Sequence, residues 1–201
     1  MGRLRAKDRR EQLLDTAAVL FAQRGYARST TAELAKAAGV TEPIIYRHFE
    51  SKKDLFIALV ERTATRTLEL WAQRLADAKD AAERLRRLLG DNPMTLEETR
   101  EPYLVMMQAI TEVDDREIRK AVTSHFADLH GFLVKELRRA QAERRVLSRF
   151  SAEIIAWTLI HIGLGYGMLG ALGVDGQGED QAGHTVRELI ERLLIGGEPG
   201  R

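Results

Sequence analysis

The spacing of apolar residues predicts an all-α protein. Apolar residues recur three or four positions apart in most long segments, as they do on one face of an α-helix. Neither a period-two alternation nor a pair of β-branched runs around a hairpin turn occurs. We therefore expect helices over residues 9–24, 30–38, 41–49, 52–78, 81–89, 102–112, 115–144, 152–172 and 181–195, with a helical or irregular piece at 95–101.

Two of these helices flank a tight turn in the first quarter of the chain. Thr30 can cap the first of them, and Glu33 is placed to complete a capping box. Gly39 then supplies the left-handed residue at which a helix stops. Thr41 can cap the next helix, and Pro43 falls in its first turn, where a missing N–H costs nothing. This arrangement is typical of a helix-turn-helix, whose second helix lies in the DNA major groove.

A longer motif extends over this unit. The DNA-binding signature of the tetracycline-repressor (TetR) family is similar to the run T-x-x-x-L-A-x-x-A-G-V-T-x-x-x-I-Y-x-H-F-x-S-K-x-x-L, which ends at Leu55. The resemblance implies a homodimeric transcriptional regulator, most often a repressor that a small molecule releases from DNA. It also implies an N-terminal three-helix DNA-binding domain, expected at residues 1–55, and a larger helical domain for dimerisation and effector binding, expected at 56–201.

The distribution of charge agrees with a terminal DNA-binding module. Residues 1–53 hold 11 Lys and Arg against 6 Asp and Glu, a net charge of +5, and the remaining residues have a net charge of −4. A basic end on a mildly acidic body is the pattern expected when one domain binds DNA. The basic arm at residues 2–10 either contacts phosphate or the minor groove, or is a solvated terminus.

Eight side chains in this unit are candidates for DNA contact. The resemblance implies phosphate contacts for residues that each offer a hydrogen-bond donor: Thr31, Tyr46, His48 and Lys52. The exposed front of the second helix supplies candidates for base contacts: Thr41, Glu42, Pro43 and Arg47. Arg47 is suited to guanine, and Glu42 is suited to the amino group of cytosine. Glu42 is also explained as a charge that the helix dipole stabilises, and the donors as ordinary surface residues.

Two C-terminal helices are expected to join two copies of the chain. The segment at 152–172 is apolar nearly all round, so it should be buried on more than one side. Its glycines suit close helix–helix contact better than a phosphate loop, because no strand precedes them. We expect a homodimer through residues 152–172 and 181–195; the alternative is a helix buried within one chain.

Large, adaptable side chains recur on the central helices. By default each of them fills the core, but the resemblance implies an effector cavity, and such side chains suit a small, mainly apolar ligand. The candidate lining residues are Trp71, Tyr103, Met106, Met107, Phe126, Trp157 and His161. A ligand held there is expected to tilt the helix at 52–78 and change the spacing of the two recognition helices on a palindromic operator.

Other functions lack support in the sequence. The chain has no cysteine, which excludes a thiolate metal site and a cysteine nucleophile and fits a cytoplasmic protein. We find no catalytic or nucleotide-binding motif, no expected cofactor, and no metal site, since His125 and His130 are poorly spaced to share an ion. No signal peptide and no apolar run of transmembrane length is expected. A ligand-independent DNA-binding regulator or an architectural protein is the alternative function, and the acidic body argues against the latter.

Overall fold

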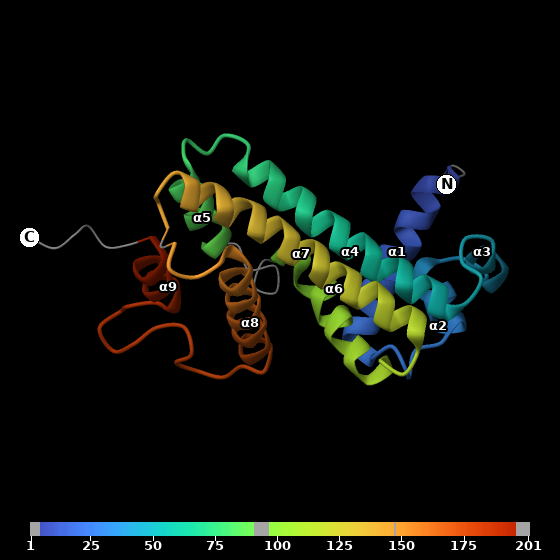
Figure 1. The fold of residues 1–201 in the computed structure, drawn as a ribbon. Helices are drawn as coiled ribbons and strands as arrows, with labels where there is room; N and C mark the ends of the chain where they lie inside the picture. The colour runs from blue at the N-terminus through green and yellow to red at the C-terminus, as the bar shows by residue number, and fades with distance from the viewer. Residues whose placement is uncertain (1–4, 91–96, 147, 196–201) are drawn as a thin grey trace, which may run out of the picture. The chain divides into compact units, whose positions relative to one another are not determined.

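The helical class is confirmed in the part of the chain that the structure describes. The structure, a computed structural model, describes residues 5–90, 97–146 and 148–195. No strand occurs in these residues, although Glu179 and Thr185 form an isolated β-bridge. The elements in chain order (Figure 1) are α1 (Ala6–Arg24), α2 (Thr31–Ala38), α3 (Glu42–Tyr46), α4 (Lys52–Leu75), α5 (Ala81–Gly90), α6 (Glu97–Gln108), the 3₁₀ helix η1 (Ala109–Glu112), α7 (Arg116–Ala142), α8 (Ala152–Ala171) and α9 (Val186–Ile195).

The chain divides into two compact units. The first consists of Met1–Thr65 and Glu97–His125, and the second of Arg66–Leu96 and Phe126–Arg201. The first unit therefore contains the helix-turn-helix together with the beginning of α4, all of α6 and η1, and the beginning of α7. The expected domain boundary at residue 55 stays a prediction. The division into compact units instead first breaks after Thr65.

Aromatic packing joins α1, the turn that follows it and α4. Leu13, Leu14 and Phe21 form the buried face of α1. The Tyr26 ring lies 5.6 Å from Phe21 and 4.3 Å from Phe56 of α4, measured between centroids. Each large apolar side chain buried in this way contributes about 1.5–3 kcal/mol. The first unit thus has a core of its own.

Pro102 lies inside a helix rather than at its beginning. The expected helix at 102–112 instead runs from Glu97 to Gln108, and its last part tightens into η1. The first four N–H groups of a helix have no intrahelical acceptor, so a proline at the sixth residue removes about one intrahelical hydrogen bond. The expectation that Pro102 marks the beginning of the helix was therefore wrong.

The last helix begins later than expected. We expected it to begin at residue 181, but α9 begins at Val186. Glu188 N–H donates to the Thr185 hydroxyl at 3.1 Å, and Thr185 N–H donates to the Glu188 carboxylate at 2.7 Å. This reciprocal pair is a capping box, which fixes the beginning of a helix. The T-x-x-E pattern at residues 185–188 is the sequence signal for this later beginning.

Other boundaries differ by a few residues or lie outside the described residues. The fourth helix ends at Leu75 rather than near residue 78, and the seventh ends at Ala142 rather than near residue 144. Asp115, one of two expected caps for α7, accepts from the Glu117 and Ile118 N–H groups at 2.9 and 3.3 Å. Residues 1–4 of the basic arm, residues 91–96 and residues 196–201 lie outside the described residues.

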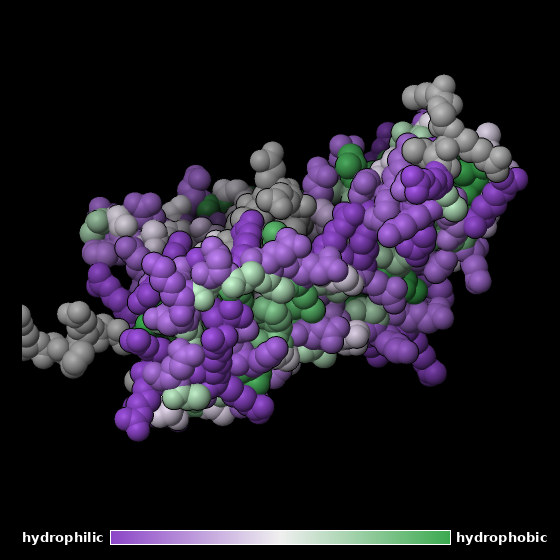
Figure 2. Space-filling model, turned by 90° about the horizontal axis from the view of Figure 1, so that it is seen from above, coloured by the Kyte–Doolittle hydropathy of each residue, from purple (hydrophilic) through white to green (hydrophobic). Residues whose placement is uncertain are grey.

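The eighth helix exposes much of its apolar surface in the single chain. Ile155, Ala156 and Ile160 are buried, whereas Ile154, Tyr166 and others are exposed. The space-filling view shows hydrophobic residues exposed between hydrophilic ones on the face it presents (Figure 2). By length and composition alone α8 could cross a membrane, contrary to expectation, and 22% of the relevant window is buried in the single chain. One such helix is weak evidence for a membrane span, because core helices of soluble proteins pass the same test.

Candidate nucleic-acid interface

Local hydrogen bonds set the geometry of the helix-turn-helix. Thr30 and Glu33 form the expected capping box, with Glu33 N–H donating to the Thr30 hydroxyl at 3.2 Å and Thr30 N–H donating to the Glu33 carboxylate at 2.9 Å. The backbone N–H and hydroxyl of Thr30 hold the pKa of Glu33 below its usual range. Gly39 has φ = 66°, so it ends α2 in the left-handed conformation that glycine adopts without strain. The turn therefore forms as the sequence predicts.

The recognition helix is shorter than expected. The sequence indicated residues 41–49, whereas α3 covers Glu42–Tyr46. Thr41 occupies the N-cap position, but its side chain makes no capping hydrogen bond, so the expected cap was wrong. Pro43 lies in the first turn as expected, and Ile45, which is 1% exposed, anchors the helix to the core.

The candidate residues on α2 and α3 form a polar cluster. The Thr31 hydroxyl donates to the Glu42 carboxylate at 2.7 Å, and it lies 3.2 Å from the Tyr46 hydroxyl. Tyr46 is 52% exposed, and Thr31 and Glu42 are partly buried. Two predicted phosphate donors and a predicted base acceptor thus meet at one place. The sequence placed Glu42 at the front of α3 but did not indicate this contact.

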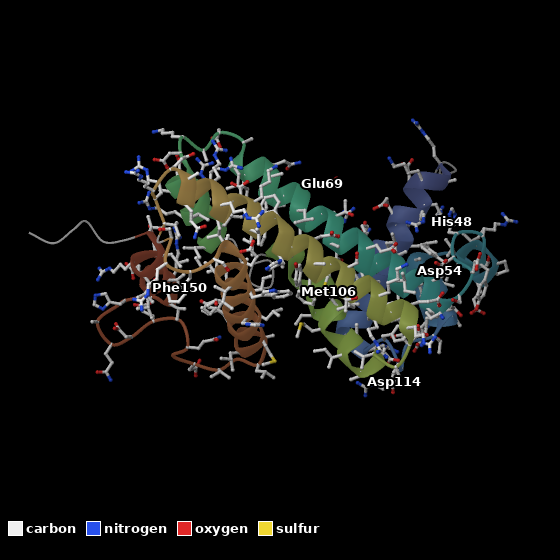
Figure 3. The ribbon with its side chains drawn as sticks, viewed as in Figure 1. His48, Asp54, Glu69, Met106, Asp114 and Phe150 are labelled. Carbon is white, nitrogen blue, oxygen red and sulfur yellow. The ribbon has the colours of Figure 1, made fainter. Side chains whose placement is uncertain are left out.

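The remaining candidates of the recognition helix lie at its ends. Thr41 and Pro43 are exposed at the beginning of α3, and Arg47 is exposed at its end. His48 follows in the turn that leads to α4, and its side chain is partly buried (Figure 3). Further along the same turn, the Phe49 ring packs 4.9 Å below the Arg10 guanidinium of α1. This places a cation from α1 next to the turn that follows α3, a contact that the sequence did not indicate.

Lys52 is directed toward the protein itself. Its ammonium donates to the carbonyls of Tyr26 and Ser29 at 3.0 and 3.1 Å, and it lies 4.4 Å from the centre of the Tyr26 ring. Lys52 therefore holds the turn that precedes α2. A phosphate contact through this side chain stays a prediction, and it would have to share the ammonium with these carbonyls.

Gln108 holds the same turn from the other side. Its carboxamide oxygen accepts from the Tyr26 N–H at 2.9 Å, and its amide nitrogen donates to the Phe21 carbonyl at 2.9 Å. The last residue of α6 is thus bonded to the end of α1 and to the turn that follows. No local sequence pattern signals this clamp, because its partners are 82 and 87 residues away.

The candidate effector residues fall into groups that belong to different compact units. In the first unit, α6 carries Tyr103, Met106 and Met107. The Tyr103 hydroxyl lies 2.9 Å from His125 Nε2, both residues being buried, and Met106 is 2% exposed. Figure 3 labels Met106 on α6. The first unit therefore brings three candidates together on one helix. An effector site there stays a prediction.

The other effector candidates lie in the second unit. Trp71 is buried and packs against Phe132, with the ring centroids 5.7 Å apart, and Phe126 is partly buried. Trp157 stacks on His130 at 4.5 Å and on His161 at 6.1 Å, and it is 38% exposed. Trp157 and His161 thus lie at the surface of the single chain.

The expected dimer helices carry exposed apolar side chains. Leu189 and Leu193 of α9 are 58% and 61% exposed, and Met168 and Leu172 at the end of the α8 segment are 48% and 71% exposed. A Cβ atom added at Gly165 would meet nothing within 4 Å of it in the single chain. Such exposure of large apolar residues is typical of an interface that another molecule covers.

Comparison with known proteins identifies the family. The family described as "Bacterial regulatory proteins, tetR family" matches residues 13–59, which include α2 and α3. The nucleoid occlusion factor SlmA of Marinobacter nauticus is 30% identical over 146 residues, covering 72% of this chain and 74% of that protein. The chain belongs to the TetR family. Its relatives include proteins named as transcriptional regulators and as nucleoid occlusion factors.

Two further relatives define how far this similarity extends. The HTH-type transcriptional activator FasR of Mycolicibacterium smegmatis is 38% identical over 85 residues, which cover 42% of this chain and 39% of FasR. The chain thus spans less than half the length of the first curated relatives it matches. A transcriptional regulator from Saccharomonospora viridis, crystallised in complex with choline, has 24% identity and a TM-score of 0.78, with 92% of this chain and 93% of that chain covered. This similarity shows that the fold shared with that structure extends beyond the DNA-binding unit.

A metal centre finds no support in the described residues. No group of three or more His, Cys, Asp or Glu side chains in residues 5–90, 97–146 and 148–195 is placed to hold an ion.

Proposed function

We propose that this TetR-family protein is a repressor that binds a palindromic operator as a homodimer and leaves it when a small, mainly apolar molecule binds. The observation that carries the proposal is the clamp of Gln108, because it joins the helix with three effector candidates to the turn that precedes α2. A ligand that moves α6 would thereby move the helix-turn-helix.

The DNA contacts in this proposal follow side-chain chemistry. Thr31, Tyr46, His48 and Lys52 serve as phosphate donors, and Thr41, Glu42, Pro43 and Arg47 face the bases. Arg47 is exposed at the end of α3 and offers the bidentate donor that guanine accepts. Phosphate contacts set orientation and base contacts set sequence preference.

The homodimer is supported by the exposed leucines of α9 and by the apolar end of α8. An obligate interface is more apolar than ordinary protein surface, and a two-fold dimer uses the same patch on both copies. Two copies would present two α3 helices, as a palindromic site requires, with half-sites about 34–36 Å apart or a multiple of that distance.

Ligand response is supported by composition and by fold. Tyr103, Met106 and Met107 give α6 an adaptable apolar surface with a polar hydroxyl. The S. viridis protein of the same fold was crystallised with choline, a small organic molecule. A coupling of about 1–3 kcal/mol between ligand and DNA would change operator affinity about 5- to 150-fold.

Selection of bound duplexes from a random pool tests the proposal, followed by a promoter reporter that carries the enriched site. Repression that a small molecule relieves supports it, and an enriched site without two-fold symmetry contradicts the dimer. Because FasR is named an activator, increased reporter expression is the outcome that would assign activation instead.

The name of the M. nauticus relative motivates a second candidate function. SlmA is named a nucleoid occlusion factor, and its similarity extends over 72% of this chain. A ligand-independent DNA-binding role would show as many chromosomal sites away from promoters. Mapping the enriched sites on the genome separates the two functions.

A further inference from the structure

The cluster of Thr31, Glu42 and Tyr46 has two hydroxyl protons. These are too few to keep the hydrogen bonds inside the cluster and also donate to DNA phosphates. An ionised carboxylate only accepts hydrogen bonds, so Thr31 donates its single hydroxyl proton to Glu42. With that proton engaged, the 3.2 Å contact between the two hydroxyls needs the Tyr46 proton. Both hydroxyl protons are therefore directed into the cluster and away from any phosphate.

The charge of the cluster acts in the same direction. Glu42 places a carboxylate next to both hydroxyls, so a phosphate that approaches them meets a like charge and finds both donors already engaged. The carboxylate accepts its hydrogen bond from Thr31 and is only partly buried. It can therefore leave the cluster when another donor becomes available.

We propose that Glu42 is a specificity-determining residue that blocks the Thr31–Tyr46 phosphate site until it finds a base donor. On unrelated DNA the carboxylate stays on Thr31 and the site binds phosphate poorly. On the cognate site the carboxylate accepts from a cytosine amino group, and the two hydroxyls become free to donate to phosphate. Correct base contact thus adds a phosphate contact, which increases the difference between specific and unrelated DNA.

This inference rests on the proposed placement of Thr31 and Tyr46 against phosphate. The test uses the full chain with two duplexes: the one it enriches from a random pool, and a shuffled duplex of the same composition. Failure to enrich any duplex would contradict the proposed function itself. The inference is tested only by how variants distinguish the two duplexes.

Removal of the carboxylate should favour unrelated DNA. Glu42→Ala is expected to tighten binding to the shuffled duplex about 10- to 100-fold, the factor that one hydrogen bond to a charged group represents. Because the released hydroxyls are uncharged and neutralise no phosphate, this gain should persist at high salt rather than follow the counterion-release slope. The enriched duplex should gain less or lose affinity, so the ratio of the two affinities falls.

A charge-matched control separates this mechanism from simple repulsion. Glu50 is exposed just beyond α3, and Glu50→Ala removes the same charge without touching the cluster. General repulsion would give equal gains for both variants on both duplexes, and that result would overturn the inference.

A further set of variants tests whether the gain comes from the Thr31 and Tyr46 hydroxyl protons. In a Thr31→Val, Tyr46→Phe background the extra gain from Glu42→Ala should vanish, because no hydroxyl remains to be released. Helical content measured by circular dichroism checks that the background folds. If Thr31→Val does not fold, Tyr46→Phe alone is used, and there the gain should shrink without vanishing, because the Thr31 hydroxyl remains. An undiminished gain in the background would refute the proposal.

Discussion

The clamp between α6 and the end of α1 can be broken with one substitution. In Gln108→Leu the Tyr26 N–H loses its acceptor at 2.9 Å. The Phe21 carbonyl loses the Gln108 amide but keeps the bond from the Gly25 N–H at 2.8 Å. The principal loss is therefore one unsatisfied N–H in a partly buried turn, which costs about 1–2 kcal/mol.

This loss has two measurable consequences. For a chain of this size the melting temperature should fall by roughly 2–8 °C, since each 1 kcal/mol corresponds to roughly 2–4 °C. The turn that leads to α2 would be less well ordered, so binding to the enriched duplex should weaken. The loss cannot exceed the free energy of the clamp, so it is at most about 5- to 30-fold. Thermal unfolding and fluorescence anisotropy measure the two quantities.

A matched control lies in the second unit. Gln141 also donates its amide to a backbone carbonyl, that of Phe150, at 2.9 Å. Gln141→Leu should lower the melting temperature without changing DNA affinity. Gln108→Leu would behave like this control if it left operator affinity unchanged within about twofold. The clamp would then only support the fold, and the proposed coupling between α6 and the helix-turn-helix would be refuted.

Three further substitutions test stability and assembly. Arg84 donates to both oxygens of Glu136, which is 5% exposed, so Arg84→Ala should destabilise the protein by about 3–5 kcal/mol in chemical denaturation, and an unchanged midpoint would contradict the importance of this pair. The hydrogen bonds from Thr30 lower the pKa of Glu33 in the folded protein. The stability they provide is therefore present above the ordinary pKa of a glutamate and is lost as the pH falls through the lower folded value. Glu33→Gln should reduce the pH dependence of unfolding in that window. Leu193 is 61% exposed, and Leu193→Arg should convert a dimer into monomers in sedimentation, whereas a retained dimer would place the interface elsewhere.

Local signals made part of this structure predictable from the sequence. The capping box of Thr30 and Glu33 and the left-handed Gly39 depend on residues a few positions apart, and both formed as expected. Thr41 shows the limit of the same reasoning, because it has the right residue type at the N-cap but makes no capping bond. Residue type at a position indicates what can form, and packing decides what does.

Lys52 shows why the site was harder to predict than the helices. The family signature contains this lysine next to the recognition helix, and an exposed lysine near DNA is readily interpreted as a phosphate contact. Its ammonium instead binds carbonyls that are 23 and 26 residues earlier and lies over the Tyr26 ring. Only the fold brings these groups together. The same turn is held by Gln108 from α6, so a signature residue and an unrelated glutamine act on one element. The family signature therefore includes a residue that holds the helix-turn-helix in place as well as residues expected to contact DNA. Lys52→Ala should lower the stability of the protein together with its affinity for every duplex.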